Sequence, residues 1–147
     1  MKRLLFTVIS MLFAGALLAQ TENKIVGVWL TQDKDSKVQI YKGKDGSFHG
    51  AIVWLKEPTR NGQPKKDDKN PDAKLKSRPI MGLNLLAGFH FDKDENEWID
   101  GTIYDPKSGK TYKCLMWFDG DPNMLHVKGF IGFSLMGKEI QWTKSTM

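Results

Sequence analysis

The sequence has 147 residues, carries 22 basic and 17 acidic residues, and has a formal net charge of +5. This length is sufficient for one domain with a single hydrophobic core, and no internal repeat or second domain is evident. The lone cysteine, Cys114, excludes an internal disulfide, and the residues around it predict a small buried apolar side chain.

The first residues have the pattern of a secretory signal peptide. Lys2 and Arg3 precede an apolar run over residues 4–18, and small residues near its end offer a cleavage point before Gln20. The run is shorter than the roughly 20 residues that span a bilayer, which disfavours a membrane anchor. We therefore predict a signal peptide at residues 1–19, a mature domain at residues 20–147 with a net charge of +3 and no transmembrane segment, and a periplasmic or secreted location.

The mature chain reads as a series of short strands separated by turns rich in Gly, Pro, Asp and Asn. The predicted strands cover residues 26–31, 37–42, 47–55, 85–91, 97–104, 111–118, 124–130 and 137–144. Mostly short connections predict an all-β fold, a single up-and-down antiparallel β-barrel of about eight strands. A β-sandwich of seven or eight strands is the alternative.

One long irregular connection, residues 56–78, interrupts this series. It contains three prolines, and a short helix around residues 71–76 is compatible with its sequence. Connections of this length in a compact domain are typically lids, binding loops or disordered segments.

Alternation within the strands predicts which side chains point into the barrel. The inward sets are Phe48, Gly50, Ile52 and Trp54; Tyr112, Cys114, Met116 and Phe118; Leu125, Val127 and Gly129; and Ile140 with Trp142. These sets contain no charged residue, so the predicted interior is apolar.

Gly27-Val28-Trp29 on the first strand is similar to the Gly-x-Trp signature of lipocalins and other calycins. In that superfamily the Trp plugs the closed end of the barrel, and a basic residue of the last strand packs across it. The resemblance assigns that second role to Lys144, although Arg is more usual and Lys lacks its planar stacking surface.

A longer pattern resembles the bacterial exported family known as domain of unknown function 2147. The matching segments are Asp68–Asp72, Arg78–Leu83, Trp98–Pro106, Gly109–Tyr112, Lys128–Gly132 and Trp142–Thr143. The resemblance covers nearly all of the mature chain and implies a calycin-type barrel and export. It implies no settled activity.

No catalytic, metal or cofactor site is predicted. His49 and His126 fall on outward strand faces, and with His90 they lack the spacing of zinc sites. Residues 92–97 are similar to the acidic start of a calcium loop, but the sixth position is Glu97 instead of Gly and the twelfth is Ile103 instead of Glu. The basic loop has no interleaved aromatic residues for stacking on bases, so nucleic acid is not an expected partner.

The two ends of the predicted barrel differ in charge, because alternate connections of a meander lie at the same end. The turns at residues 43–46, 92–96 and 119–123 share one end, where three basic residues face seven acidic ones, a net charge of −4. The connections at residues 32–36, 55–84, 105–110 and 131–136 share the other end, with a net charge of about +5. The Gly-x-Trp end is thus acidic and closed, and the long loop lies at a basic mouth.

A basic mouth above an apolar interior favours a small apolar or amphiphilic ligand with an anionic head. We expect Trp54, Tyr112, Met116 and Phe118 to line its cavity, and Arg78 to meet its head group.

Two other hypotheses stay open. In the first, the barrel is filled by its own side chains and is an interaction module of the cell envelope. It would present the 55–79 loop, with Asp68, Asn70 and Arg78, to a protein or glycan. In the second, the chain is an enzyme that uses Asp100 and Asp105 as a carboxylate pair. Asp105 is also the expected first residue of a β-turn.

Overall fold

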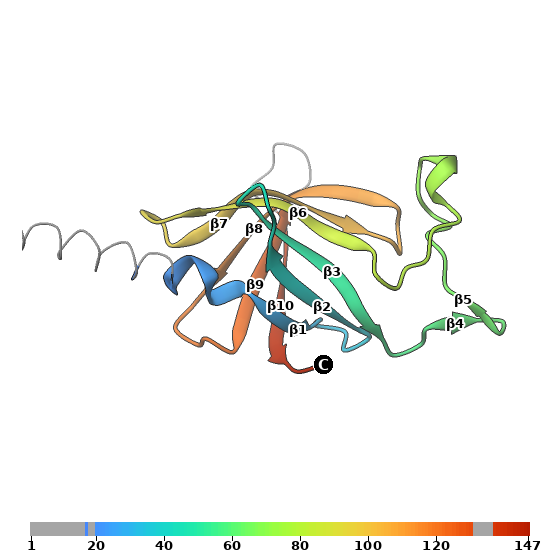
Figure 1. Ribbon diagram of the computed structural model, residues 1–147, viewed down its shortest axis with the longest axis horizontal. Coiled ribbons are helices and arrows are strands. Elements are labelled where there is room, and N and C mark those ends of the chain that lie inside the picture. The colour runs from blue at the N-terminus through green and yellow to red at the C-terminus, as the bar shows by residue number, and fades with distance from the viewer. Residues whose placement is uncertain (1–16, 18–19, 131–136) are drawn as a thin grey trace, which may run out of the picture.

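The computed structural model describes Leu17, residues 20–130 and residues 137–147 (Figure 1). The predicted signal peptide, apart from Leu17, and the predicted connection at residues 131–136 lie outside the described residues. In the described part of the chain, no helix is long and apolar enough to cross a membrane.

Eight antiparallel strands close into a barrel, which confirms the predicted fold class. These strands are β1 (Gly27–Leu30), β2 (Ser36–Lys42), β3 (Phe48–Leu55), β6 (Asn84–Asp92), β7 (Glu97–Asp105), β8 (Lys110–Phe118), β9 (Met124–Phe130) and β10 (Lys138–Ser145). The order around the barrel is β1-β10-β9-β8-β7-β6-β3-β2, an up-and-down meander. A 3-10 helix, η1 (Asn23–Ile25), precedes β1. The barrel closes where β1 pairs with β10, with Trp29 opposite Lys144.

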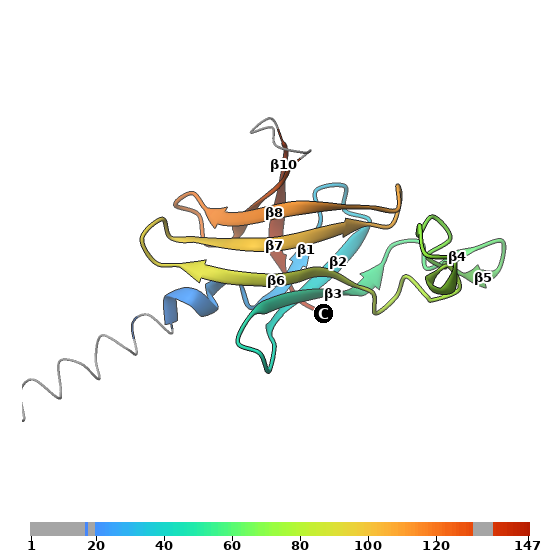
Figure 2. The same ribbon diagram turned by 90° about the horizontal axis from the view of Figure 1, so that it is seen from above.

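Among the described residues, the connection between β3 and β6 is the longest excursion from the barrel (Figures 1 and 2). We call residues 56–83 the mouth arm. It contains the short hairpin β4 (Thr59–Arg60) and β5 (Gln63–Pro64), and a 3-10 helix, η2 (Ala73–Leu75), within the range where a short helix was compatible with the sequence. The arm folds on itself through a bridge between Lys66 and Pro79, and in both views it extends beyond one end of the barrel.

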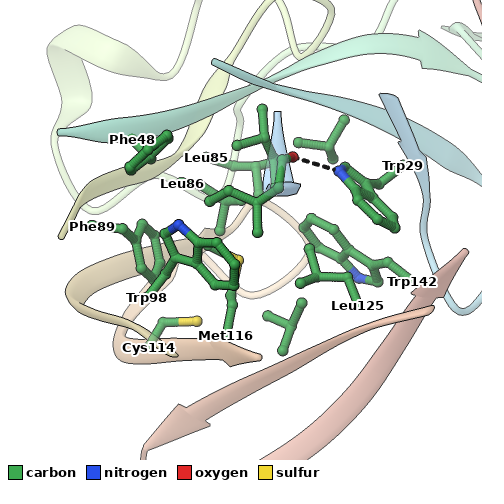
Figure 3. Close-up of a cluster of buried hydrophobic side chains, with 14 of the residues drawn as sticks. Trp29, Phe48, Leu85, Leu86, Phe89, Trp98, Cys114, Met116, Leu125 and Trp142 are labelled. Carbon is green, nitrogen blue, oxygen red and sulfur yellow. Dashed lines mark hydrogen bonds between the residues drawn. The ribbon is translucent and has the colours of Figure 1, made fainter. Parts of the chain in front are cut away.

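Large aromatic side chains fill the opposite end of the barrel, which we call the closed end (Figure 3). Trp29 and Trp98 are almost fully buried, and each packs against Phe118, with ring centroids 5.8 and 5.6 Å apart. The indole of Trp29 donates a hydrogen bond to the Ile25 carbonyl at 2.8 Å, and that of Trp98 to the Glu22 carbonyl at 2.9 Å. The residues before β1 therefore satisfy both indole N–H groups, as buried donors require.

Close packing at the closed end depends on a glycine. A Cβ added at Gly101 would lie 2.4 Å from the ring of Phe89, so only a residue without a side chain fits there. The described residues at this end of the barrel thus form a closely packed core.

Candidate functional site

The other end of the barrel holds a cavity of about 900 Å³, which lies within the range of ligand pockets. Its apolar wall is formed by Ile52, Leu55, Ile80, Leu85, Ile103, Val127, Ile140 and Trp142, with Tyr104 and Tyr112 adding phenol groups. Its rim is formed by residues from the β1–β2 connection, the mouth arm and the β7–β8 turn. These are connections that the meander predicts at a single end.

Of the four side chains expected to line the cavity, Tyr112 does so. Met116 and Phe118 point inward but lie in the closed end. Met116 is fully buried in the core there, and Phe118 packs between two tryptophans. The alternation predicts the inward face but carries no information on depth along the barrel axis. The position of Met116 and Phe118 along the barrel axis could therefore not be predicted from the alternation.

The alternation predicts that Trp54 lies in the interior, but the structure places it outside. The pairing of β2 with β3 shifts between Lys37 and Val38, which face Trp54 and Ile52 respectively, so Val53 is an extra residue on β3. Such a bulge inverts the alternation beyond it. Trp54 is accordingly 38% exposed with Lys37 Nζ 5.6 Å from its ring centroid, while Leu55 turns inward and lines the cavity.

Arg78, the expected head-group contact, faces a different partner. Its Nε donates to Asp67 Oδ2 at 2.8 Å, and its guanidinium lies 5.6 Å from the ring centroid of Tyr104. It does not belong to the cavity lining among the described residues. The charge of Arg78 is thus used inside the mouth arm.

Asp67 is the residue that sequence reasoning missed. It is fully buried, and its carboxylate accepts hydrogen bonds from Tyr104, Asn70 and Arg78 at 2.5, 2.8 and 2.8 Å. Burial raises the pKa of Asp67, but these three hydrogen bonds outweigh it and hold the pKa below its ordinary value. Tyr104 is on β7 and the other three residues are in the mouth arm, so this cluster attaches the arm to the barrel. No local pattern predicts such a contact, because Asp67 and Tyr104 are distant in sequence.

The two other residues expected at the mouth have separate roles. Asp68 is on the cavity rim and pairs with Arg60 at 2.9 Å. Asn70 is buried, donates to Asp67 and accepts from the backbone N–H of Asp72 at 2.9 Å. Asp68 is thus an exposed rim group, whereas Asn70 is part of the buried attachment.

At the closed end, Gly27, Trp29 and Lys144 lie together. Lys144 Nζ is 5.6 Å from the ring centroid of Trp29, and a Cβ at Gly27 would come within 3.9 Å of the Lys144 side chain. Gly27 also has φ +145°, a backbone conformation that favours glycine.

Lysines dominate the rim of the cavity. Lys65 pairs with Glu57 at 3.7 Å, and Lys107 lies 2.7 Å from Asp35, a hydrogen bond that raises the pKa of Lys107. Lys56, Lys66 and Lys69 also line the cavity, and no carboxylate of a described residue lies within 4 Å of their amino groups. The cations available to an anionic head are therefore these lysines rather than Arg78.

Of the two carboxylates considered as a catalytic pair, Asp100 and Asp105, only Asp105 lines the cavity. Asp105 is on the rim, and its carboxylate accepts from the Lys107 backbone and the Ser108 hydroxyl, which closes a turn. Asp100 is exposed and is not among the residues that line the cavity. Among the described residues, no group of three or more His, Cys, Asp or Glu side chains is arranged to hold a metal ion.

An apolar cavity inside an eight-stranded meander, open at one end and plugged by a Gly-x-Trp tryptophan at the other, defines a lipocalin-like barrel. A family model described as "Uncharacterized protein conserved in bacteria (DUF2147)" matches residues 27–144, so the chain belongs to this family.

Its fold is similar to that of protein HP1028 from the human pathogen Helicobacter pylori, a protein described as belonging to the lipocalin family. The TM-score is 0.69, the sequence identity is 24%, and the match covers 83% of each chain. None of the curated proteins matches the chain.

Proposed function

We propose that this protein is an exported carrier that holds a small amphiphilic molecule in the open half of its barrel, with the anionic head of the ligand at the mouth. The observation that carries the proposal is the cavity of about 900 Å³, with an apolar wall below a rim of lysines that lack carboxylate partners among the described residues. A wall of Ile, Leu, Val and Trp side chains favours an alkyl or ring system because it removes apolar surface from water.

Lys56, Lys66 and Lys69 replace Arg78 as the proposed head-group contacts. All three are exposed at the rim, where a carboxylate or phosphate can reach them while the tail of the ligand lies inside. A charge-assisted hydrogen bond contributes about 1.5–3 kcal/mol, so losing one weakens binding about tenfold or more. The hypothesis of a filled interaction module is disfavoured by the open cavity, because it assumed a solid interior.

Gly129 offers a direct test of the cavity. It lies on β9 and lines the cavity. An added Cβ would lie 3.5 Å from the Tyr112 side chain, an ordinary van der Waals distance. Gly129→Ala is therefore tolerated, whereas Gly129→Leu places additional carbon atoms where the ligand tail would lie. With dodecanoic acid as the probe and Trp fluorescence or calorimetry as the readout, we expect micromolar binding by the wild type. Gly129→Leu should weaken it at least about tenfold and Gly129→Ala less than about threefold.

The head-group part is tested with dodecanol, which has the same chain and no charge. Replacing Lys66 and Lys69 with Gln should weaken dodecanoic acid about tenfold or more and leave dodecanol nearly unchanged. Equal losses of affinity for both probes would mean that the lysines do not contact the head group. If neither probe binds the wild type, or if Gly129→Leu binds as well as Gly129→Ala, the carrier proposal is wrong.

Export is tested separately. Protein recovered from the periplasm or medium should have an intact mass that begins near Gln20, and a mass that retains residues 1–19 would refute processing.

A further inference from the structure

The mouth arm carries a charge excess that the cavity does not account for. Residues 56–83 contain eight basic and four acidic side chains, a net charge of +4. Three of the four acids are in ion pairs within the arm: Glu57 with Lys65, Asp67 with Arg78 and Asp68 with Arg60. The fourth, Asp72, accepts a hydrogen bond from the backbone of Lys74 and so caps η2.

Five lysines of the arm consequently have no carboxylate of a described residue within 4 Å. They are Lys56, Lys66, Lys69, Lys74 and Lys76. Lys74 and Lys76 are not among the described residues that line the cavity, so a ligand inside the barrel does not explain them. Unpaired cations of one sign on one segment create a local positive field that attracts an anionic partner.

An apolar side chain lies between these two lysines. Leu75 is the central residue of the sequence Lys74-Leu75-Lys76, and 37% of it is exposed at the end of η2, a helix without a buried residue. Both views place the arm, with the helical turn in light green, beyond the end of the barrel (Figures 1 and 2). Met81, at the base of the arm, is also 42% exposed. The outermost part of the mouth thus combines basic and apolar groups.

The other end of the barrel has the opposite charge. The turns there, with their flanking residues, have a net charge of −4. A negatively charged surface therefore attracts the mouth and repels the closed end, so the electrostatic field of the protein selects one orientation.

We propose that the mouth arm docks the open end of the barrel onto an anionic lipid bilayer, with Leu75 entering the headgroup region between Lys74 and Lys76. Flexible lysines around a shallow apolar residue match a charged interface with hydrocarbon beneath it. The arm has no aromatic residue, which disfavours single-stranded nucleic acid as the occupant because base stacking is absent. The proposal does not depend on the ligand, since it rests on side chains outside the cavity. In a carrier, it would place the mouth against the surface from which an amphiphile is taken or to which it is delivered.

The test uses the chain from Gln20, so that the apolar run at residues 4–18 does not itself bind lipid. This chain retains every strand and both 3-10 helices of the described residues. Vesicles of phosphatidylcholine alone are compared with vesicles that contain about a third phosphatidylglycerol, and bound protein is measured by co-sedimentation. We expect binding to the anionic vesicles only, and loss of that binding in high salt.

The key variant is Lys74→Glu/Lys76→Glu, and the matched control is Lys44→Glu/Lys93→Glu. The control makes the same change in net charge on exposed lysines of turns at the closed end. Each lysine near an anionic surface contributes about 1 kcal/mol, or about fivefold, so the arm variant should lose at least about 25-fold. The control should change less than about threefold. Equal losses in both would mean that net charge alone drives association, and the docking proposal would fail.

Two further measurements identify the kind of partner. Leu75→Ser should weaken vesicle binding severalfold without changing its salt dependence, and the emission of a Leu75→Trp variant should shift to the blue on anionic vesicles alone. Heparin serves as a lipid-free polyanion, and binding to heparin without binding to anionic vesicles would overturn the proposal in favour of a polyanionic polymer. Dodecanoic acid binding should persist in Lys74→Glu/Lys76→Glu. The experiments can therefore refute the docking proposal without refuting the carrier proposal, and the reverse.

Discussion

The two ends of the barrel are built from the same eight antiparallel strands, yet one end is filled and the other is open. Two glycines show the reason. At Gly101 the space of a missing side chain is taken by the ring of Phe89, whereas a Cβ added at the cavity-lining Gly129 would make only ordinary contacts, the nearest at 3.5 Å. The closed end combines large aromatic rings, and the apolar wall of the open end consists mainly of the smaller side chains of Ile, Leu and Val. The volume of the inward side chains, more than their polarity, separates a core from a binding site.

The largest expected difference between the ends is in stability. Trp29→Ala should lower the free energy of unfolding by about 3–5 kcal/mol, because it opens a void in the packed closed end. Leu55→Ala, at the open end, should cost about 1 kcal/mol, since its side chain already borders a cavity. Urea unfolding followed by circular dichroism measures both. Equal losses would contradict the division into a filled and an open half.

The attachment of the mouth arm should show a dependence on pH. Asp67→Asn should destabilise the protein by about 1–3 kcal/mol near neutral pH, because Tyr104 and Arg78 lose a charged acceptor. The pKa of Asp67 is below its ordinary value of 3.8, so its contribution is complete above that value and is lost as the pH falls through the folded-state pKa. The difference between wild type and variant in thermal unfolding should thus shrink as the pH falls below 3.8.

Asp68→Asn is the matched control for this experiment. Asp68 is next to Asp67 in sequence, but its ion pair with Arg60 is exposed, so its loss should cost less than about 0.5 kcal/mol at any pH. An equal loss of stability in Asp68→Asn and Asp67→Asn would mean that the buried cluster around Asp67 contributes no more than an exposed ion pair.

The smallest expected effect on stability concerns Lys144, which lies over the ring of Trp29. Lys144→Ala should cost about 0.5–1 kcal/mol, because a cation that faces an indole is lost at an exposed site. Lys144→Arg should retain or exceed wild-type stability through the planar stacking of its guanidinium. A melting temperature for Lys144→Arg below that of Lys144→Ala would exclude the stacking role.

The fold could be predicted from the sequence, whereas much of the site could not. Strand number, order and the basic mouth follow from alternation and turn spacing, which are local signals. The position of Trp54 depends on the extra residue Val53, and a bulge leaves no mark in the alternation of apolar residues. The Asp67 carboxylate accepts hydrogen bonds from Tyr104 on β7 and from Arg78 in the mouth arm. Those partners are set by tertiary contacts between segments that are far apart in the chain.

Closure of the barrel by β1 and β10 has a consequence for how the chain folds. The first barrel strand has two neighbours, and one of them is the last strand of the chain, so Trp29 meets Lys144 only once nearly every residue is available. Until then β1 and β9 each present an unpaired edge, which is a template for pairing with other chains. The pairing of β1 with β10 also joins the strands that are farthest apart in the sequence of the barrel, and such long-range contacts slow folding. A chain truncated before Lys138 should therefore associate through these edges rather than fold as a smaller barrel.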